Sequence, residues 1–135
     1  MEKRSNRIPK ILQDRFDLLS ELNAADKLLL ELEKPGYSTE AEREYLRLRI
    51  SQMEKDLKAT EEEVLNFLNQ FRNKNRVYVC LMLHYFVGYS WTQVGDILKM
   101  SCDAARETAY RALNKLAMGE QITTGSRIKG NSFLT

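Results

Sequence analysis

The sequence predicts an all-α fold, in which an N-terminal helical hairpin is followed by a compact unit of three shorter helices. Helix breakers are rare, since 135 residues contain 2 prolines and 6 glycines, and four of those glycines lie at or beyond Gly95. Apolar residues recur every three or four positions, and charged residues, 30% of the chain, flank them. This pattern is typical of long amphipathic helices and not of a turn-rich β fold.

The first helix is expected to begin near Pro9, because proline fits the first turn of a helix. The helix should end at Lys34-Pro35-Gly36, where proline disfavours helix before it and glycine accepts a left-handed turn. Leucines beside the main apolar stripe widen it, so we expect contact with more than one helix. The stripe consists of Ile8, Ile11, Leu12, Phe16, Leu19, Leu22, Leu29 and Leu32.

The second helix should begin at Thr39, because Thr39 and Glu42 have the spacing of a capping box. It is expected to run to about Phe71 and to be roughly 45 Å long. Charged residues flank its apolar seam, as in a coiled coil. The seam consists of Leu46, Ile50, Met53, Leu57, Val64 and Leu68.

Two antiparallel helices alone bury little apolar surface, so the hairpin needs a further partner. We expect the seam to provide oligomerisation, most simply in a homodimer, and an ordinary core within one chain is the alternative. The hairpin is assigned to residues 1–75 as a region for oligomerisation or partner contact. It ends at the polar break Arg72-Asn73-Lys74-Asn75.

Residues 76–118 are expected to form three helices. The first runs from Arg76 to about Val87 and stops at Gly88, and Ser90 caps the second. Ser101 caps the third, which runs to about Leu116 after the short turn 99–101. The core between the helices should contain Val94, Ile97, Ala105, Ala109 and Leu113, with Gly95 allowing close approach and Met100 plugging the turn. Residues 119–135 are rich in Gly, Ser and Thr and are expected to be a flexible tail.

Two short helices joined by about three residues, the second longer and capped by serine, are typical of a helix-turn-helix unit. In such a unit the first helix crosses the DNA backbone and the second enters the major groove. Residues 1–75 contain 14 Lys and Arg and 15 Asp and Glu, a net charge of −1, whereas residues 76–135 contain 7 and 4, a net +3. The modest basic excess therefore lies in the C-terminal unit.

Residues 89–116 resemble the fourth region of bacterial sigma factors. The resemblance rests on the Tyr-Ser start at Tyr89, the Val-Gly pair at Val94, the Met-Ser turn at Met100 and the closing Arg-Ala-Leu-Asn-Lys-Leu from Arg111. With a charged hairpin before it, the whole layout is similar to small phage- and prophage-encoded ArpU-like late-transcription regulators.

The resemblance implies the residues that contact DNA. Arg106 is the strongest candidate for base contact, because arginine can bind guanine through two hydrogen bonds. The implied base-contact residues are Cys102, Asp103, Arg106 and Glu107. The expected backbone contacts are Ser90, Thr92, Gln93, Ser101, Arg111 and Lys115. Sigma units carry more basic residues at the start of this helix, so we expect weak binding by a monomer and a need for a dimer, a contact from the tail or RNA polymerase.

The sequence therefore predicts a sequence-specific, double-stranded DNA-binding transcription regulator, phage or prophage encoded and located in the cytoplasm of a bacterial host cell. Its expected partners are DNA, a second copy of the chain and RNA polymerase. Two alternatives remain open. One is a small terminase-like DNA-packaging subunit, and the other is an adapter that docks RNA polymerase without a DNA site of its own.

An enzyme is not expected, because we find no glycine-rich phosphate loop, nucleophile elbow or metal-ligand cluster. No cofactor and no small-molecule substrate are expected either. Cys80 and His84 have metal-ligand spacing but lack further soft ligands, so we expect no metal, and His84 is interpreted as a buried, hydrogen-bonded histidine. The longest apolar stretch, Val77 to Tyr89, is too short to cross a membrane, and the charged N-terminal residues are not followed by the apolar segment of a secretory signal, so we expect neither feature.

Overall fold

The computed structural model describes residues 8–119, which form helices and connecting turns with no β-strand among them. The all-α prediction is therefore confirmed. None of the helices in this part of the chain has the length and apolar character needed to cross a membrane. The expected tail, apart from Gly119, lies outside the described residues. The elements are α1 (Lys10–Leu32), α2 (Glu40–Leu68), the 3-10 turn η1 (Asn69–Phe71), α3 (Asn75–Leu81), the π-helical η2 (Met82–Val87), α4 (Trp91–Leu98) and α5 (Cys102–Ala117).

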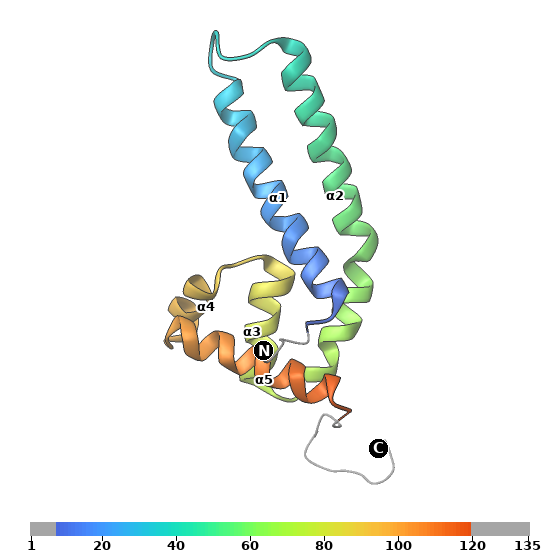
Figure 1. Ribbon diagram of the computed structural model, residues 1–135, viewed down its shortest axis with the longest axis vertical. Coiled ribbons are helices and arrows are strands. Elements are labelled where there is room, and N and C mark those ends of the chain that lie inside the picture. Colours follow the sequence, from blue (N-terminus) through green and yellow to red (C-terminus); the bar gives the residue numbers. More distant parts are fainter. Residues whose placement is uncertain (1–7, 120–135) are drawn as a thin grey trace, which may run out of the picture.

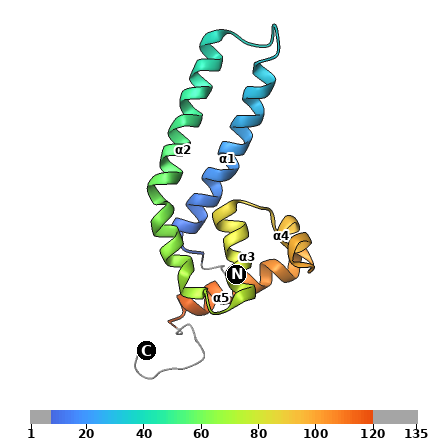
Figure 2. The same ribbon diagram turned by 180° about the vertical axis from the view of Figure 1, so that it is seen from behind.

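Helices α1 and α2 run antiparallel and project away from a compact group formed by α3, α4 and α5 (Figures 1 and 2). Gly36 takes a left-handed conformation (φ 79°) in the connection between them. The Thr39 hydroxyl accepts from the backbone N–H of Glu42 at 3.1 Å, and the Glu42 carboxylate accepts from the N–H of Thr39 at 2.8 Å. The predicted capping box is therefore confirmed.

The outer half of the hairpin has a small core of its own. Met53 is 2% exposed, and Leu46 and Ile50 are also buried. The α1 side of this cluster consists of Leu18, Leu22, Ala25, Leu29 and Leu32. Two exposed ion pairs also cross the hairpin, Arg49 to Glu21 at 3.1 Å and Arg47 to Glu33 at 3.3 Å. Exposed pairs contribute little, so apolar burial holds this half together.

The inner half of the hairpin belongs to a second, larger core. Leu12 from α1 and Val64 and Leu68 from α2 are fully buried together with side chains of the C-terminal helices. This half of the hairpin therefore follows the alternative that the sequence left open, a core within one chain. The buried residues of this core are Leu12, Val64, Leu68, Phe71, Cys80, Leu81, Tyr85, Val94, Ala105, Ala109 and Leu113.

The side chains assigned to oligomerisation are used within one chain, which corrects that assignment. Leu46, Ile50 and Met53 are covered by α1, Val64 and Leu68 lie in the larger core, and Leu57 is half-buried. The physical reason is that the apolar stripe of α1 and the C-terminal unit together supply enough apolar surface to cover the seam. Leu28 and Leu30, which widen that stripe in the sequence, are exposed. A dimer stays a prediction, and it requires other side chains.

The helix expected from Arg76 to Val87 changes character part-way. It is α-helical to Leu81 and then widens into η2, where the N–H of Gly88 donates to the Leu83 carbonyl, five residues back, at 3.1 Å. Gly88 ends the segment in the left-handed region (φ 99°), as predicted. A Cβ on Gly88 would lie only 3.2 Å from the Leu19 side chain, so α1 passes close to this turn.

Arg15 joins three elements from a buried position. Its Nε donates to the Phe86 carbonyl at 3.1 Å and its Nη1 to the Leu57 carbonyl at 3.3 Å, while the guanidinium lies 4.1 Å from the centre of the Phe86 ring. Burial lowers the pKa of Arg15, and Glu61 acts in the opposite direction. An arginine stays charged nonetheless, so these carbonyls satisfy a buried cation.

Candidate nucleic-acid interface

Helices α4 and α5 are joined by three residues, and the joint is tight. Lys99 takes the left-handed conformation (φ 61°, ψ 47°), and the N–H of Met100 donates to the Gly95 carbonyl at 2.9 Å. A Cβ on Gly95 would lie 2.5 Å from the Met100 carbonyl oxygen. The turn can therefore fold back onto α4 only because residue 95 is glycine.

The faces that α4 and α5 turn toward each other are largely those predicted. Val94, Ala105, Ala109 and Leu113 are buried. Ile97 is 51% exposed, and its predicted place in the core was wrong. The buried face of α4 runs through Trp91, Val94 and Leu98 at three- and four-residue spacing, so Ile97 falls at its edge, and the helix ends one residue later.

The N-terminus of α4 is exposed and capped. The Ser90 hydroxyl accepts from the N–H of Gln93 at 3.1 Å, and the Gln93 side chain accepts from the N–H of Ser90 at 2.9 Å. The predicted cap is confirmed. The cap uses acceptor oxygens, so the Ser90 O–H and the Gln93 amide N–H groups are still donors beside the exposed Thr92. Three side chains with hydrogen-bond donors thus gather at one helix N-terminus.

A stack of three rings supports this N-terminus from beneath. His84 lies between Phe16 of α1 and Trp91 of α4, with ring centroids 4.1 and 3.8 Å apart. Nδ1 of His84 lies 2.7 Å from the Tyr89 carbonyl, to which it donates as N–H. Burial lowers the pKa of His84 to about 4, and the bond to Tyr89 acts in the opposite direction. The ring is therefore neutral near pH 7, and the interpretation of His84 as a buried, hydrogen-bonded histidine is confirmed.

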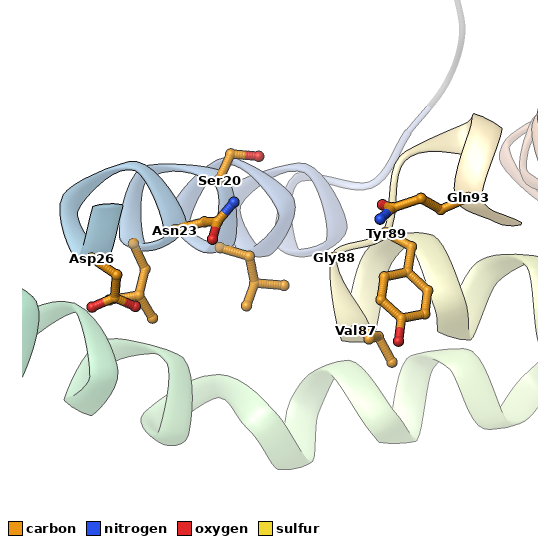
Figure 3. Close-up of a pocket in the computed structure, with 9 residues that line it drawn as sticks. Ser20, Asn23, Asp26, Val87, Gly88, Tyr89 and Gln93 are labelled. Atoms are coloured by element: carbon orange, nitrogen blue, oxygen red, sulfur yellow. The ribbon is translucent and has the colours of Figure 1, made fainter. Parts of the chain in front are cut away.

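An open pocket of about 480 Å³ lies between α1 and the turn that leads into α4 (Figure 3). Asn23 and Asp26 come from α1, whereas Tyr89 and Gln93 come from the other side. Because Asp26 places a carboxylate in the lining, this side of α4 is unfavourable for a DNA phosphate. The lining residues are Leu19, Ser20, Leu22, Asn23, Asp26, Val87, Gly88, Tyr89 and Gln93.

The charges on α5 are divided along its length. Asp103, Glu107, Arg111 and Lys115 follow one another at four-residue spacing and are exposed, with the acids nearer the N-terminus. This order suits the helix dipole and stabilises the helix. It also places negative charge at the end that is expected to enter a DNA groove. The Ser101 hydroxyl accepts from the N–H of Ala104 at 3.0 Å, so the predicted cap at this end is confirmed.

Both arginines of α5 contact carboxylates of their own helix. Nη2 of Arg106 lies 2.6 Å from Oδ1 of Asp103, and Nη2 of Arg111 lies 3.5 Å from Oε2 of Glu107. The side chains of Arg106 and Asp103 are 42% and 83% exposed. Pairs this exposed are weak, so a stronger acceptor can replace the carboxylate. Arg106 also has further N–H groups beyond the one facing Asp103.

The structure brings the predicted contact residues into two groups. Ser90, Thr92 and Gln93 gather at the start of α4, and the other group lies on α5. The α5 group consists of Ser101, Cys102, Asp103, Arg106 and Glu107 in the first turns, with Arg111 and Lys115 further along. Cys102 is half-buried, and its sulfur is a free thiol.

Sequence reasoning missed Arg76. Its Nη1 lies 3.5 Å from the Met100 sulfur, which puts an exposed cation beside the turn between α4 and α5. The separation of 24 residues gives no local signal for this contact. The left-handed conformation of Lys99 was missed as well, because lysine is an uncommon residue for it.

Within residues 8–119, no three side chains of His, Cys, Asp or Glu lie together in a way that could hold a metal ion. Cys80 and His84, whose spacing is typical of metal ligands, are both buried in the larger core. Comparison of the chain with protein-family models, curated proteins and solved structures finds no match.

Proposed function

We propose that α3, α4 and α5 form a helix-turn-helix unit of the sigma region-four type, and that the protein is a double-stranded DNA-binding transcription regulator. The observation that carries the proposal is the α4–turn–α5 arrangement, fixed by the contact between Gly95 and Met100, with two serine-capped N-termini exposed. A helix held in this way can present its first turns to the major groove.

In the proposed complex, α4 contacts the backbone and α5 reads the bases. The donors of Ser90, Thr92 and Gln93, aided by the helix N-terminus, bind phosphate oxygens. Arg106 donates to guanine O6 and N7, and Asp103 orients its guanidinium. Arg111 and Lys115 contact phosphates further along the groove.

The same charges that stabilise α5 limit its affinity for DNA. Asp103 and Glu107 oppose phosphate, and one unit carries few cations to release counterions. We therefore propose that specific binding needs a second unit or RNA polymerase. On the resemblance to ArpU-like regulators, we propose that the protein acts for a phage or prophage in the cytoplasm of a bacterial cell.

A second candidate function is an adapter that docks RNA polymerase without its own DNA site. The observation that favours it is the pairing of both α5 arginines with carboxylates, which gives a mixed-charge surface suited to a protein partner.

Salt dependence separates the two functions. Fluorescence anisotropy on the full chain with random-sequence duplex, at several salt concentrations, measures the slope of log affinity against log salt. A regulator gives a steep negative slope because each phosphate contact releases counterions. Absence of binding at low salt, together with capture by RNA polymerase, would favour the adapter.

Arg106→Ala tests the base contact once a preferred duplex has been selected. We expect binding to that duplex to weaken by about 1–3 kcal/mol while binding to random duplex changes less. Lys27→Ala, which removes an exposed cation from α1, is the matched control and should bind like wild type. Wild-type affinity of Arg106→Ala for the selected duplex, at unchanged helicity, would contradict the assignment.

A further inference from the structure

The outward face of α2 carries a second heptad stripe. Residues 41, 45, 48, 52, 55 and 59 follow one another in alternating steps of four and three, the spacing of a coiled-coil seam. All six are exposed. Tyr45 and Leu48 are 68% and 62% exposed, although both are large apolar side chains. The stripe consists of Ala41, Tyr45, Leu48, Gln52, Lys55 and Ala59.

Nothing in residues 8–119 covers this stripe. The opposite face of α2, with Leu46, Ile50 and Met53, packs against α1. Helical periodicity therefore points the stripe away from α1, and in both views α1 lies along one side of the outer half of α2 only (Figures 1 and 2). Exposure alone does not mark a binding surface, since Leu30 of α1 is 67% exposed as well. Tyr45 and Leu48 differ from it because they lie next to each other on one heptad stripe.

We infer that the stripe binds a second copy of this chain, with the two α2 helices antiparallel and a two-fold axis at Gln52. In this register, Tyr45 of each copy faces Ala59 of the other, and Leu48 faces Lys55. A large ring thus meets the smallest side chain of the stripe. An open depression of about 420 Å³ lies at that place, lined by Ser51, Glu54, Lys55, Lys58 and Ala59, and the Tyr45 ring of the second copy fits there.

Charges beside the stripe are complementary in the same register. Glu44 of one copy faces Lys58 of the other. Arg49, whose Nη2 pairs with Glu21 of its own chain, faces Asp56 of the other copy with its remaining N–H groups. The two-fold axis makes each pair occur twice, so four opposite-charge contacts flank the seam. One heptad further out on the same flank, Glu42 of one copy would face Glu63 of the other, and these two carboxylates repel each other. The contact therefore ends there and covers about residues 44–59.

A parallel pair is disfavoured by the stripe itself. In parallel register, Lys55 would face Lys55 of the second copy inside the seam, where like charges repel. In the antiparallel register, the methylene stem of Lys55 covers Leu48 and its ammonium group reaches water. The position of one lysine thus selects the direction of the pair.

This inference is independent of DNA binding, because α2 contributes no residue to the proposed interface with DNA. Its first test is sedimentation equilibrium of the full chain over a range of concentrations without DNA. We expect a concentration-dependent dimer that Tyr45→Glu and Leu48→Glu each weaken by at least about tenfold. Leu30→Glu, on an exposed residue of α1, is the matched control and should dimerise like wild type.

Two results would overturn the inference at this stage. One is a wild-type chain that stays monomeric at millimolar concentration. The other is a dimer that Tyr45→Glu and Leu48→Glu leave intact while circular dichroism shows unchanged helicity. The substituted side chains are exposed in the single chain, so the variants are expected to fold.

A charge swap tests the flanking pairs. Lys58→Glu should weaken the dimer, because it places two glutamates opposite each other on both sides of the axis. Adding Glu44→Lys to the same chain should restore dimerisation, since the opposite-charge contacts are then re-formed in reverse. A double variant that dimerises no better than Lys58→Glu alone would rule out this register.

Disulfide trapping tests the direction of the pair. In a Cys102→Ser background, which leaves only the buried Cys80, one chain carries Leu48→Cys and a second, tagged chain carries Lys55→Cys. The antiparallel register predicts a disulfide only between the two different chains in the mixture. Disulfides within either chain type alone would show a parallel pair and overturn the inference.

Discussion

At the residue scale, His84 shows how one buried ring joins parts of the chain that are distant in sequence. It touches Phe16 of the hairpin on one face and Trp91 of α4 on the other, and Tyr85 packs edge-on at 4.7 Å. Its hydrogen bond to the Tyr89 carbonyl fixes which nitrogen carries the proton. A charged imidazole is costly in this arrangement, because His84 is only 6% exposed.

The lowered pKa of His84 predicts a loss of stability in mild acid. The unfolded chain binds a proton on His84 near its ordinary pKa of 6.5, whereas the folded chain does so only near 4. The unfolded state therefore gains relative stability as pH falls from 6.5 to 4. The loss of folding free energy from this group should reach about 3 kcal/mol.

Denaturant unfolding at several pH values measures this loss. His84→Phe keeps a flat ring in the stack but cannot titrate, so its stability should fall less steeply over the same window. NMR titration of the chain's single histidine provides an independent check. Parallel curves for the two proteins, or a folded-state pKa near 6.5, would contradict the argument.

The sequence predicted the state of some residues but not their partners. A lone histidine on an apolar stretch was expected to be buried and hydrogen-bonded, and this is confirmed. Its contact with Phe16 depends on how the hairpin docks, which no local pattern encodes. Arg15 lies between Leu12 and Leu19 on the apolar stripe of α1, so a charge within a buried stripe was the available signal.

At the element scale, the ends of the helices were more predictable than their internal geometry. Thr39, Ser90 and Ser101 all cap helices as expected, because capping depends on residues within one turn. The widening of η2 was not predictable, since it coincides with long-range contacts, among them the bond from Arg15 to Phe86. The sequence prediction put Ile97 in the core because three- and four-residue spacing does not fix which side of a short helix faces the core.

Gly95→Ala should reveal the close contact inside the α4–α5 joint. At an open helical position the same change stabilises a protein by up to about 1 kcal/mol. Here the new Cβ would lie 2.5 Å from the Met100 carbonyl oxygen, so we expect a destabilisation of about 1–3 kcal/mol.

Thermal unfolding of Gly95→Ala and wild type gives the sign directly. Gly36→Ala is a useful comparison, because a Cβ there meets nothing within 4 Å and the only cost is its left-handed backbone. A Gly95→Ala chain that is as stable as wild type would mean that the turn relaxes away from α4 without cost.

At the scale of the whole molecule, the hairpin and the C-terminal unit share one core. The sequence divided the chain at residue 75, and α3 does begin there, at Asn75. Leu12, Val64 and Leu68 nonetheless lie in the same cluster as Val94 and the buried face of α5. The sequence could not decide which helices cover the α2 seam. A seam that faces helices of its own chain has the same apolar periodicity as one that faces a second copy.

The shared core predicts that the two parts unfold together. Trp91, the only tryptophan, reports on the C-terminal unit by fluorescence, and far-ultraviolet circular dichroism is dominated by α1 and α2. The two transitions should coincide in denaturant. Leu12→Ala, which empties a buried site on α1, should shift both by about 2–5 kcal/mol. Separate transitions, or a shift of the dichroism signal alone, would show that the hairpin folds by itself.

The two apolar clusters share no residue, and this has a consequence for how such chains diverge. The inner half of the hairpin, which includes α2 after about Leu57, is part of the larger core, and a change in length there would disturb every helix. In the outer half, α1 and α2 of one chain pack only on each other, around Leu46, Ile50 and Met53. Matched deletions or insertions of whole heptads in both helices would preserve that packing. Evolution should therefore vary the reach of this arm while the base that supports α4 and α5 keeps its dimensions.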